Sequence, residues 1–510
     1  MTDHILVLDI GTSGLRAALV NNDGLIVDAH HVSNPPSTPF AGLVEFDALE
    51  MYDKAVDAAQ QVLSRNPAAP VCGMGIANQR ASTIVWDRTT GLPVGPALGW
   101  QDLRTIMECI TAKAEHNVRF APNQTATKAG WMLKNYGADL VARAERGEIL
   151  LGTIDSWLTW KLSGQTTHVM DHTNAAVTGL VTVDGLSWDA NTCQVAGVPT
   201  AALPRLVASS SIVARIVGHG VLDGLPIAAT VGDQQASLVG QRCISRGMAK
   251  ITFGTGGMLD MYTGRVGPTV AERTQHGTFP IVAFSLEQNG NVEMHWGLEA
   301  IMLSAGTNIE WLRDDMGLIA SAEESHTIAS TVQSTEGVMY VPALLGLGTP
   351  DWDYGARGSL SGLTRGTTRA HVVRAVLEGV AHRGADLLAA ATNDAAERST
   401  RGDQFPQVHT LRIDGGMSNN ETFAQALADA TGCNVEVSSV TEATTLGAAY
   451  LAGTALSVWD SLEHAVATWR PARVFSPLKT PSEQQDARQQ WRRALDGTRR
   501  WIPDLSALDF

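Results

Sequence analysis

Four segments of this sequence place glycine beside carboxylate, hydroxyl or amide side chains, each directly after an apolar run. They are Asp9 with the loop 11–14, residues 232–235, the loop 254–257, and residues 414–419. Glycine lets a backbone approach phosphate closely and present its N–H groups, and Thr and Ser add hydroxyl donors. A carboxylate just before such a loop can hold Mg²⁺, usually through water. Together the four segments predict a nucleotide held in a cleft.

The elements that must position these segments occur twice. In each copy a glycine loop joins two predicted strands. In the first copy the loop 11–14 joins the strands 5–8 and 15–20, and in the second copy the loop 254–257 joins the strands 248–253 and 258–262. Dinucleotide-binding units instead use glycines to join a strand to a helix, so the pattern argues against one. The repeat indicates an internal duplication, with a domain boundary near residues 240–247.

The C-terminal part adds a strand, a glycine pair and a helix. Residues 411–414 predict the strand, and a helix that begins at Asn419 or Asn420 is expected to end at Gly432. Thr480 and Glu483 form a capping-box pattern with Pro481 at the first helical position. We expect this tail helix to pack back on the body of the protein.

Composition excludes several classes of protein. The 510 residues are 44% hydrophobic, which is enough apolar material for large cores and excludes general disorder. The net charge of −15 makes the chain a poor general nucleic-acid binder. Five scattered cysteines without a C-x-x-C pair indicate free thiols in a reducing compartment, although a thiol nucleophile or a zinc site stays open. The start lacks a basic leader, and no run approaches 18 apolar residues, so we expect a cytoplasmic protein without membrane contact.

The chain resembles the FGGY carbohydrate kinases over about residues 5–469, and within that family it is most similar to the glycerol kinases. The resemblance rests on LDIGT, GIANQRASTIVWD, GWQDLRT, GTIDSWLTWK, GDQQASLVG, FGTG, GLTRG, DGGMSNN and LGAAYLAG, which begin at residues 8, 75, 99, 152, 232, 253, 362, 414 and 446. It implies an α/β fold of two actin-like (ribonuclease-H-like) domains with a nucleotide cleft between them.

The same resemblance implies ATP-dependent phosphorylation of a hydroxyl of a polyol or sugar, with ATP and Mg²⁺ as cofactors. We expect residues 1–242 to form an N-terminal domain with the polyol or sugar and phosphate site, and residues 243–470 a C-terminal domain with the nucleotide site. Residues 471–510 would form the tail. The expected partner is a small-molecule substrate, with no nucleic acid and no membrane, and the chain is expected to form a homo-oligomer, a dimer or tetramer.

Carried over by position, the resemblance gives roles to single residues. Asp233 resembles the general base that takes the proton of the substrate hydroxyl, and Asp9 resembles the carboxylate for Mg²⁺. The predicted substrate-binding residues are Arg80, Ala81, Trp100, Asn123, Asp233 and Gln234, and the predicted nucleotide-binding residues are Thr12, Ser13, Arg16, Thr255, Gly306, Gly416 and Asn419.

Some of these residues also fit plainer roles. Asp233 can cap the following helix, Trp100 can be a core ring, and Arg80 can serve an ion pair. Asp102 and Arg104 are expected to be structural partners near the site.

The chain departs from the glycerol kinases at the expected substrate pocket. Ala81 stands where they have a Glu that accepts a glycerol hydroxyl, Asn123 falls near a Tyr, and Met258 replaces a Phe. A larger and differently polar pocket predicts a substrate larger than glycerol; the alternative is a glycerol kinase with a remodelled pocket. The segment 218–225 lacks the Gly-Gly-Thr-Arg sequence through which bacterial glycerol kinases bind a sugar bisphosphate regulator, so we do not expect that regulation.

Two other functional classes compete with a kinase. An actin-like, nucleotide-dependent interaction protein would not need Arg80, Trp100 and Asp233 together. A nicotinamide dehydrogenase would need a strand–GxGxxG–helix unit, which the sequence does not contain.

Overall fold

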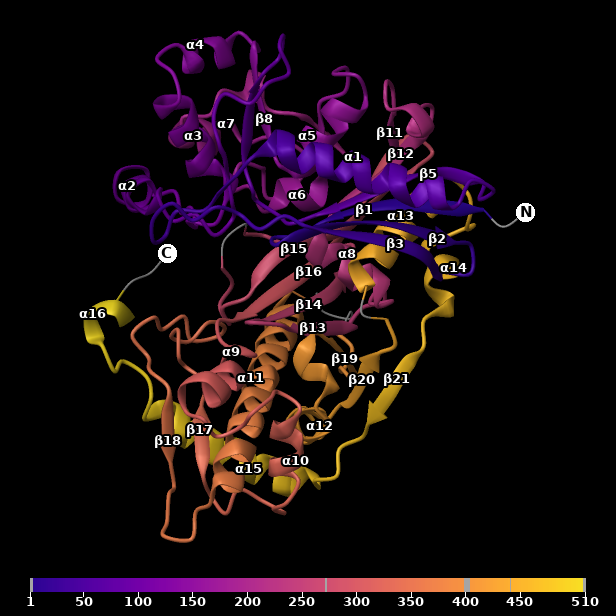
Figure 1. The fold of residues 1–510 in the computed structure, drawn as a ribbon. Coiled ribbons are helices and arrows are strands. Elements are labelled where there is room, and N and C mark those ends of the chain that lie inside the picture. Colours follow the sequence, from indigo (N-terminus) through magenta and orange to yellow (C-terminus); the bar gives the residue numbers. More distant parts are fainter. Residues whose placement is uncertain (1–2, 271–272, 399–403, 441, 508–510) are drawn as a thin grey trace.

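A computed structural model describes residues 3–270, 273–398, 404–440 and 442–507. One long sheet runs through both halves of the molecule (Figure 1). Its strands are β1 (His4–Ile10), β2 (Gly14–Asn21), β3 (Ile26–Ser33), β5 (Val71–Asn78), β11 (Ser210–Arg215), β12 (Pro226–Gly232), β13 (Ala249–Phe253), β14 (Gly257–Gly264), β15 (Phe279–Gln288), β16 (Asn291–Met302), β19 (Thr410–Asp414), β20 (Asn434–Ser438) and β21 (Pro471–Phe475). Across the sheet they follow the order β21-β20-β19-β13-β14-β16-β15-β11-β12-β5-β1-β2-β3.

The two ends of this sheet have the same topology. In the first half, β3, β2 and β1 pair antiparallel, and β5 and β12 add to β1 in parallel. In the second half, β16, β14 and β13 pair antiparallel, and β19 and β20 add to β13 in parallel. In both, a glycine loop joins the first two strands. This confirms the duplication that the sequence indicates.

Helices cover both faces of the sheet, and short strand pairs lie beside it. The short strands pair as β4 (Glu45–Phe46) with β7 (Ala97–Leu98), β6 (Ile84–Asp87) with β8 (Ile149–Gly152), β9 (Val169–Asp171) with β10 (Arg205–Val207), and β17 (Met339–Val341) with β18 (Ser359–Ser361). The α-helices are α1 (Ala48–Arg65), α2 (Ile106–His116), α3 (Thr125–Asn135), α4 (Leu140–Glu145), α5 (Ile154–Leu162), α6 (His172–Ala176), α7 (Ala190–Ala196), α8 (Asp233–Gly240), α9 (Thr307–Glu310), α10 (Glu324–Ala329), α11 (Arg369–Glu397), α12 (Glu421–Thr431), α13 (Ala443–Ala455), α14 (Leu462–Ala465), α15 (Pro481–Asp496) and α16 (Pro503–Ser506). Short turns of other helix types are η1 (Thr200–Ala202), η2 (Gly220–Leu222), η3 (Trp311–Asp315), η4 (Gly416–Asn419) and η5 (Val466–Thr468).

The helices α8 and α13 follow equivalent strands of the two halves and pack against each other. A Cβ on Gly240 would come within 1.9 Å of the Ala443 carbonyl oxygen, and one on Gly447 within 1.8 Å of the Ala236 carbonyl oxygen. Only glycine permits this close approach. The contact brings the start of α8 and the start of α13 to the centre of the molecule.

Helix α13 also completes the core of the first half. It contacts β1, β5 and β12, and Leu446, Ala449 and Tyr450 are buried in one cluster with Ile5 and Val231. Figure 1 shows α13, drawn in yellow-orange, against the indigo strands of the first half. The two halves therefore share one core at their junction.

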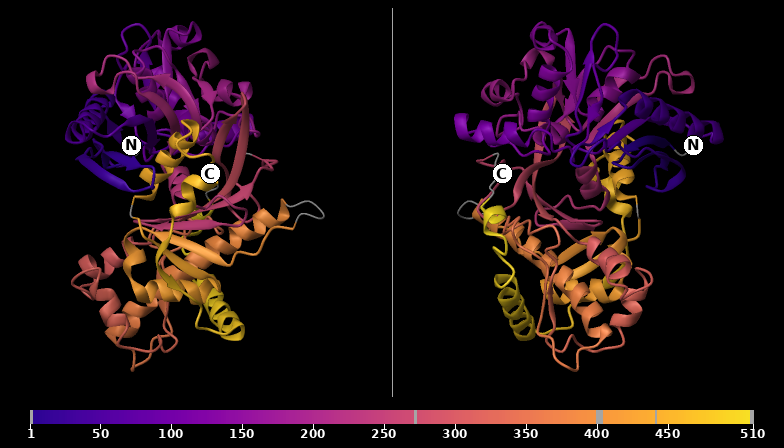
Figure 2. Two further views of the ribbon diagram at one scale, coloured as in Figure 1. Left: turned by 90° about the vertical axis from the view of Figure 1, so that its right-hand side faces the viewer. Right: turned by 60° about the vertical axis from the view of Figure 1, so that its left-hand side comes forward.

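The C-terminal segment lies on the outside of the second half (Figure 2). Thr480 and Glu483 form the capping box of α15 that the sequence predicts. Trp491 is fully buried, and its Nε1 donates to Asp386 Oδ2 of α11 at 3.0 Å. These contacts bind the tail to the longest helix of the second half.

Candidate active site

The carboxyl ends of three neighbouring parallel strands carry the polar residues of the first half. The neighbours β1, β5 and β12 end at Asp9-Ile10, at Asn78 just before Arg80, and at Gly232 just before Asp233. Strand ends at one edge of a parallel sheet form a common place for ligand-binding side chains. The structure therefore brings Asp9, Arg80 and Asp233 together.

Both carboxyl groups of this site have raised pKa values. Burial, with the nearby Asp233 carboxylate, raises the pKa of Asp9 to about 6 against the opposing effect of Arg16. Burial also raises the pKa of Asp233, while Arg80 opposes the rise. Asp9 Oδ2 accepts a hydrogen bond from Thr445 Oγ1 at 3.1 Å, so α13 contributes to the site. Two carboxylates held close together suit a cation or a transferable proton.

Arg80 joins the two halves at the base of the site. Its Nη2 donates to Glu299 Oε2 of β16 at 2.6 Å, and its Nε lies 3.8 Å from Asp233 Oδ1. The ion pair that the sequence leaves open for Arg80 is therefore formed. It also holds the guanidinium beside the proposed base, where it can contact a substrate.

Trp100 borders the first glycine loop. Its Nε1 donates to Thr12 Oγ1 at 3.1 Å, and its backbone N–H donates to Ser82 Oγ at 3.2 Å. The residue is 37% exposed, so it is not the core ring that the sequence leaves possible. The exposed part of Trp100 beside the loop is available for contact with a ligand.

Ala81 and Asn123 lie on neighbouring turns. Ala81 has a left-handed backbone with φ 59°, is 5% exposed, and its carbonyl oxygen accepts from Thr125 Oγ1 at 3.4 Å. Asn123 is exposed, and its carbonyl oxygen accepts from the buried Lys128 Nζ at 3.0 Å. Lys128 also donates to the Gly99 carbonyl at 3.1 Å, so one ammonium fixes the turns that carry Asn123 and Trp100.

The second glycine loop meets two other nucleotide candidates. The Gly306 N–H donates to the Gly254 carbonyl at 2.8 Å, and the Thr255 carbonyl accepts from the Ala305 N–H at 2.9 Å. Gly415 has φ 85°, and a Cβ on it would lie 2.4 Å from the Phe253 carbonyl oxygen. Thr255, Gly306 and Gly416 thus lie around the end of β13. A Cβ on Gly416 would meet no atom within 4 Å, so its backbone faces open space.

The remaining nucleotide candidates lie at the rims of this region. Asn419 is the exposed last residue of η4, and the exposed Ser13 accepts the Asn34 N–H with its carbonyl at 3.0 Å. Arg16 lies on β2 and forms an ion pair with Glu442, directly before α13. Arg16 therefore connects the first glycine loop to the second half.

A buried polar network holds the strand ends that carry Arg80 and Asp233. Thr173 Oγ1 of α6 accepts the Gly232 N–H at 2.8 Å and donates to Asp171 Oδ2 at 2.7 Å. Asn174 exchanges hydrogen bonds with Asn78, at 2.9 and 3.1 Å. The network fixes both strand ends before any ligand binds.

The sequence reasoning missed three charged residues under the site: Lys250, Asp260 and Glu299. They are at most 7% exposed and lie inside β13, β14 and β16. In the sequence, these residues could have been recognised as charged residues inside otherwise apolar strands. The partner of Glu299 is Arg80, which is 219 residues away, so this pairing could not be anticipated, whereas Lys250 and Asp260 are cross-strand partners on the adjacent strands β13 and β14.

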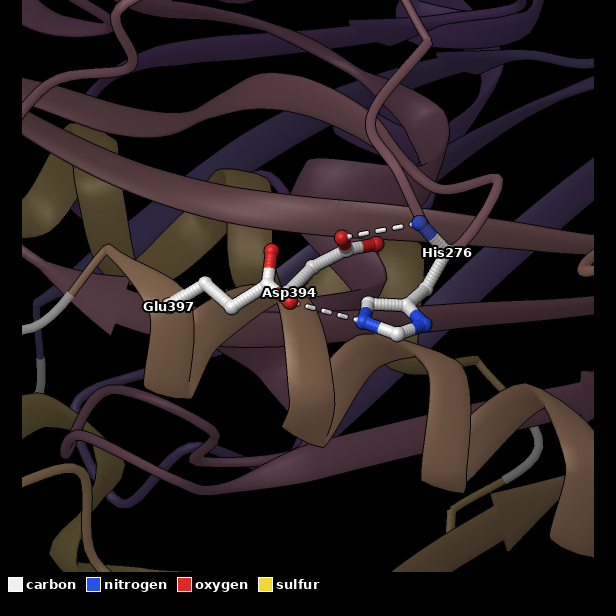
Figure 3. A group of neighbouring side chains, drawn as sticks. All are labelled: His276, Asp394 and Glu397. Carbon is white, nitrogen blue, oxygen red and sulfur yellow. Dashed lines mark hydrogen bonds and ion pairs between the residues drawn. The ribbon is translucent and has the colours of Figure 1, made fainter.

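A second group of titratable side chains lies outside this site. His276 Nε2 lies 3.0 Å from Glu397 Oε1, and the His276 N–H donates to Asp394 Oδ1 at 3.1 Å (Figure 3). Asp394 Oδ2 accepts from Thr274 Oγ1 at 2.6 Å and Thr278 Oγ1 at 2.7 Å. Because both Asp394 oxygens already accept hydrogen bonds, the group anchors the segment 274–278 to α11, and we assign it no metal.

One cavity among the described residues lies outside the site. It measures about 510 Å³ and is lined by Ile244, Arg246, Tyr262, Arg265, Ala395 and Phe405, among others. None of its lining residues is a predicted site residue. The volume of a cavity therefore does not by itself identify the active site of this protein.

Comparison with known proteins decides the family. Two family models match, for the N-terminal domain of the FGGY family of carbohydrate kinases over residues 4–240 and for its C-terminal domain over residues 249–456. The chain belongs to this family. The FGGY kinases have two actin-like domains, which agrees with the repeated half-sheets and confirms the expected fold. Membership makes the chain a phosphotransferase that acts on an alcohol group of a sugar or polyol, a small-molecule substrate.

Individual relatives agree with the family. The glycerol kinase of Janthinobacterium sp. (strain Marseille) is 38% identical over 514 residues, with 98% of this chain and 100% of the relative covered. The glycerol kinase of Geobacillus sp. (strain WCH70) is 38% identical, with 97% and 99% covered. A crystal structure of Plasmodium falciparum glycerol kinase with ADP superposes with a TM-score of 0.90 at 28% identity, covering 98% of both chains. Xylulose kinase from Lactobacillus acidophilus, at 20% identity, covers 97% of both chains with a TM-score of 0.83 and shares the fold.

No helix within the described ranges is both long enough and apolar enough for a membrane crossing. All five cysteines are free thiols, as the sequence indicates.

Proposed function

We propose that this FGGY kinase uses ATP and Mg²⁺ to phosphorylate a hydroxyl of a polyol or sugar larger than glycerol. The observation that carries the proposal is the arrangement of Asp233 beside Arg80 at one strand edge, with the pocket position after Arg80 occupied by Ala81. We further propose that the chain divides after residue 242, forms a homo-oligomer, and works in the cytoplasm, where free thiols persist.

In this proposal Asp233 is the general base. Its carboxylate takes the proton of the substrate hydroxyl while the oxygen attacks, and Arg80, Trp100 and Gln234 orient the alcohol. A positioned base is worth roughly 10² to 10⁴ in rate. ATP, when bound, supplies the phosphoryl group. Phosphoryl transfer needs positioning and charge neutralisation more than covalent chemistry from the protein.

The residues present fit the proposed cofactors. Among the described residues, Thr445 alone hydrogen-bonds the Asp9 side chain, so the carboxylate keeps acceptor capacity for Mg²⁺ or its water. The backbone near Thr255, Gly306 and Gly416, with Thr12, Ser13, Arg16 and Asn419 at the rims, offers N–H, hydroxyl and guanidinium donors for a nucleotide. The related Plasmodium falciparum structure contains ADP, which supports nucleotide binding by this chain.

The proposed substrate pocket lacks a carboxylate acceptor at Ala81. Losing one charged hydrogen bond costs roughly 1.5 to 3 kcal/mol, which is about 10- to 150-fold in kcat/KM. Glycerol would meet the Ala81 methyl instead of a carboxylate, whereas a longer substrate can bring its own hydroxyl to Asn123 or Ser82. The alternative, a glycerol kinase with a remodelled pocket, is favoured by the 38% identity to curated glycerol kinases.

A substrate panel separates the two. ATP consumption is measured with polyols and ketoses of three to six carbons, for the wild type and for Ala81→Glu. We expect a four- to six-carbon substrate to have the higher kcat/KM, and Ala81→Glu to shift the ratio towards glycerol. Glycerol as the best wild-type substrate would favour the alternative, and no turnover of any alcohol would overturn the proposed substrate range.

A further inference from the structure

Lys250 is buried directly below the first turn of α8, the helix that begins with Asp233. It is fully buried on β13, and three oxygen atoms surround its Nζ: Gln234 Oε1 at 2.8 Å, Thr252 Oγ1 at 3.0 Å and Asp260 Oδ2 at 2.9 Å. The Gln234 and Thr252 oxygens accept hydrogen bonds from the ammonium, and the Asp260 carboxylate adds an ion pair. The side chain has one well-defined position.

We propose that Lys250, held by Asp260, is a positioning residue that orients the Gln234 amide and fixes the start of α8 against the sheet of the second half. This rests on the proposed function, in which Gln234 contacts the substrate and Asp233 is the base.

The orientation of the Gln234 amide follows from the chemistry of Lys250. An ammonium can donate but not accept, so the amide oxygen must face Lys250 and the NH₂ group must point away from it. Lys250 is fully buried and Gln234 is half-buried, and the Gln234 amide oxygen is the atom that accepts from Lys250. Gln234 therefore offers hydrogen-bond donors, suited to an oxygen acceptor of the substrate.

Asp260 holds Lys250 in place from the neighbouring strand. The two residues are direct cross-strand partners of β13 and β14, and both are fully buried. On its other side Asp260 faces Glu299 of β16, which binds Arg80. The charged residues thus connect the second-half sheet with both Gln234 and Arg80, which flank the proposed base.

The charge on Lys250 persists despite burial. Burial lowers the pKa of Lys250, but the carboxylates of Asp260, Asp414 and Asp233 together raise it above its ordinary value. The same strand ends at the glycine loop 254–257, so Lys250 links the first turn of α8 to the strand that carries the proposed nucleotide loop.

The test is a double-mutant cycle that leaves no charge buried alone. Removing Lys250 singly would strand the Asp260 carboxylate, whereas replacing a buried ion pair by apolar residues of similar size is often tolerated. Lys250→Met/Asp260→Leu is therefore compared in two backgrounds, wild type and Gln234→Leu. Substrate KM, ATP KM and kcat are measured with the best alcohol of the panel.

We expect the pair replacement to raise substrate KM at least 10-fold in the wild-type background and at most about 2-fold with Gln234→Leu, because Lys250 acts through Gln234. ATP KM should not change. An equal effect in both backgrounds, or none in either, would overturn the proposal. The matched control is Arg383→Met/Asp351→Leu, a second buried ion pair, with N and O 3.0 Å apart in the second half. It should change stability without changing substrate KM.

A second measurement needs no turnover. Hydrogen–deuterium exchange of the backbone amides of α8 should be faster in Lys250→Met/Asp260→Leu than in the wild type, because the first turn has lost its anchor. Unchanged exchange would overturn the proposal even with an active enzyme. If the wild type phosphorylates no alcohol, the proposed function fails, and the exchange result still decides the role of Lys250.

Discussion

The Asp9 carboxylate should lower the stability of the ligand-free protein at neutral pH. Its pKa is about 6 in the folded chain and 3.8 ordinarily, because burial and the nearby Asp233 disfavour the charge. The folded state therefore binds the proton more tightly, and stability falls as pH rises from about 4 to above 6. One pKa unit corresponds to 1.36 kcal/mol, so the full pKa shift lowers the free energy of unfolding by about 3 kcal/mol. Solvent screening of the half-buried side chain reduces this loss to roughly 1–3 kcal/mol.

Replacement by Asn removes this cost and the proposed Mg²⁺ ligand together. Without Mg²⁺ or nucleotide and with EDTA present, we expect Asp9→Asn to melt a few degrees above the wild type at pH 8, with the difference shrinking towards pH 4. The variant should also lose at least about 10²-fold in Mg²⁺-dependent turnover. Scanning calorimetry gives the melting temperatures, and Asp57→Asn on the exposed face of α1 is the control. A variant that is less stable than the wild type at pH 8, or a difference independent of pH, would refute the reasoning.

Three further outcomes are expected. Asp233→Asn should lower kcat at least about 10²-fold while ATP binding, measured by calorimetric titration, is retained; unchanged turnover would remove Asp233 as the base. The radius of gyration from X-ray scattering should fall only when nucleotide and substrate bind together, because closure excludes water, and identical curves would contradict closure. Burial lowers the pKa of Lys128 from 10.5 to about 7, so the fold loses stability as pH falls from about 10.5 to about 7, and below that pH the full penalty persists. Lys128→Met should therefore be more favourable relative to the wild type at pH 6 than at pH 9 in urea unfolding, and a constant difference would argue against this account.

Local patterns in the sequence predicted much of the fold. The glycine loops between strands, the Asn420 cap of α12 with Gly432 at its end, and the α15 capping box all depend on neighbouring residues. The repeat of strand, loop and strand predicted the duplicated half-sheets for the same reason. Asp9 and Asp233 stood out because they directly follow apolar strands.

The contacts that the sequence could not predict are those between side chains that only the fold brings together. Arg80 and Glu299 are 219 residues apart, and only the sheet order brings them together. Lys250 and Asp260 are closer in sequence, but nothing local shows that Lys250 reaches across to Gln234. The exposure of Trp100 likewise depends on the loop around Thr12. Residue types in the sequence therefore identified candidate site residues, whereas the buried charged residues that support them could be identified only from the three-dimensional structure.

The position of α13 has a consequence for how the chain is made. A ribosome releases β1, β5 and β12 long before residues 443–455, yet these strands bury their apolar face against that helix. The nascent first half must therefore keep Ile5, Val7 and Val231 uncovered, or covered by a chaperone, until synthesis is almost complete. A fragment that ends at residue 242 would keep that surface permanently exposed and should aggregate. Supplied in trans, the rest of the chain should rescue its solubility.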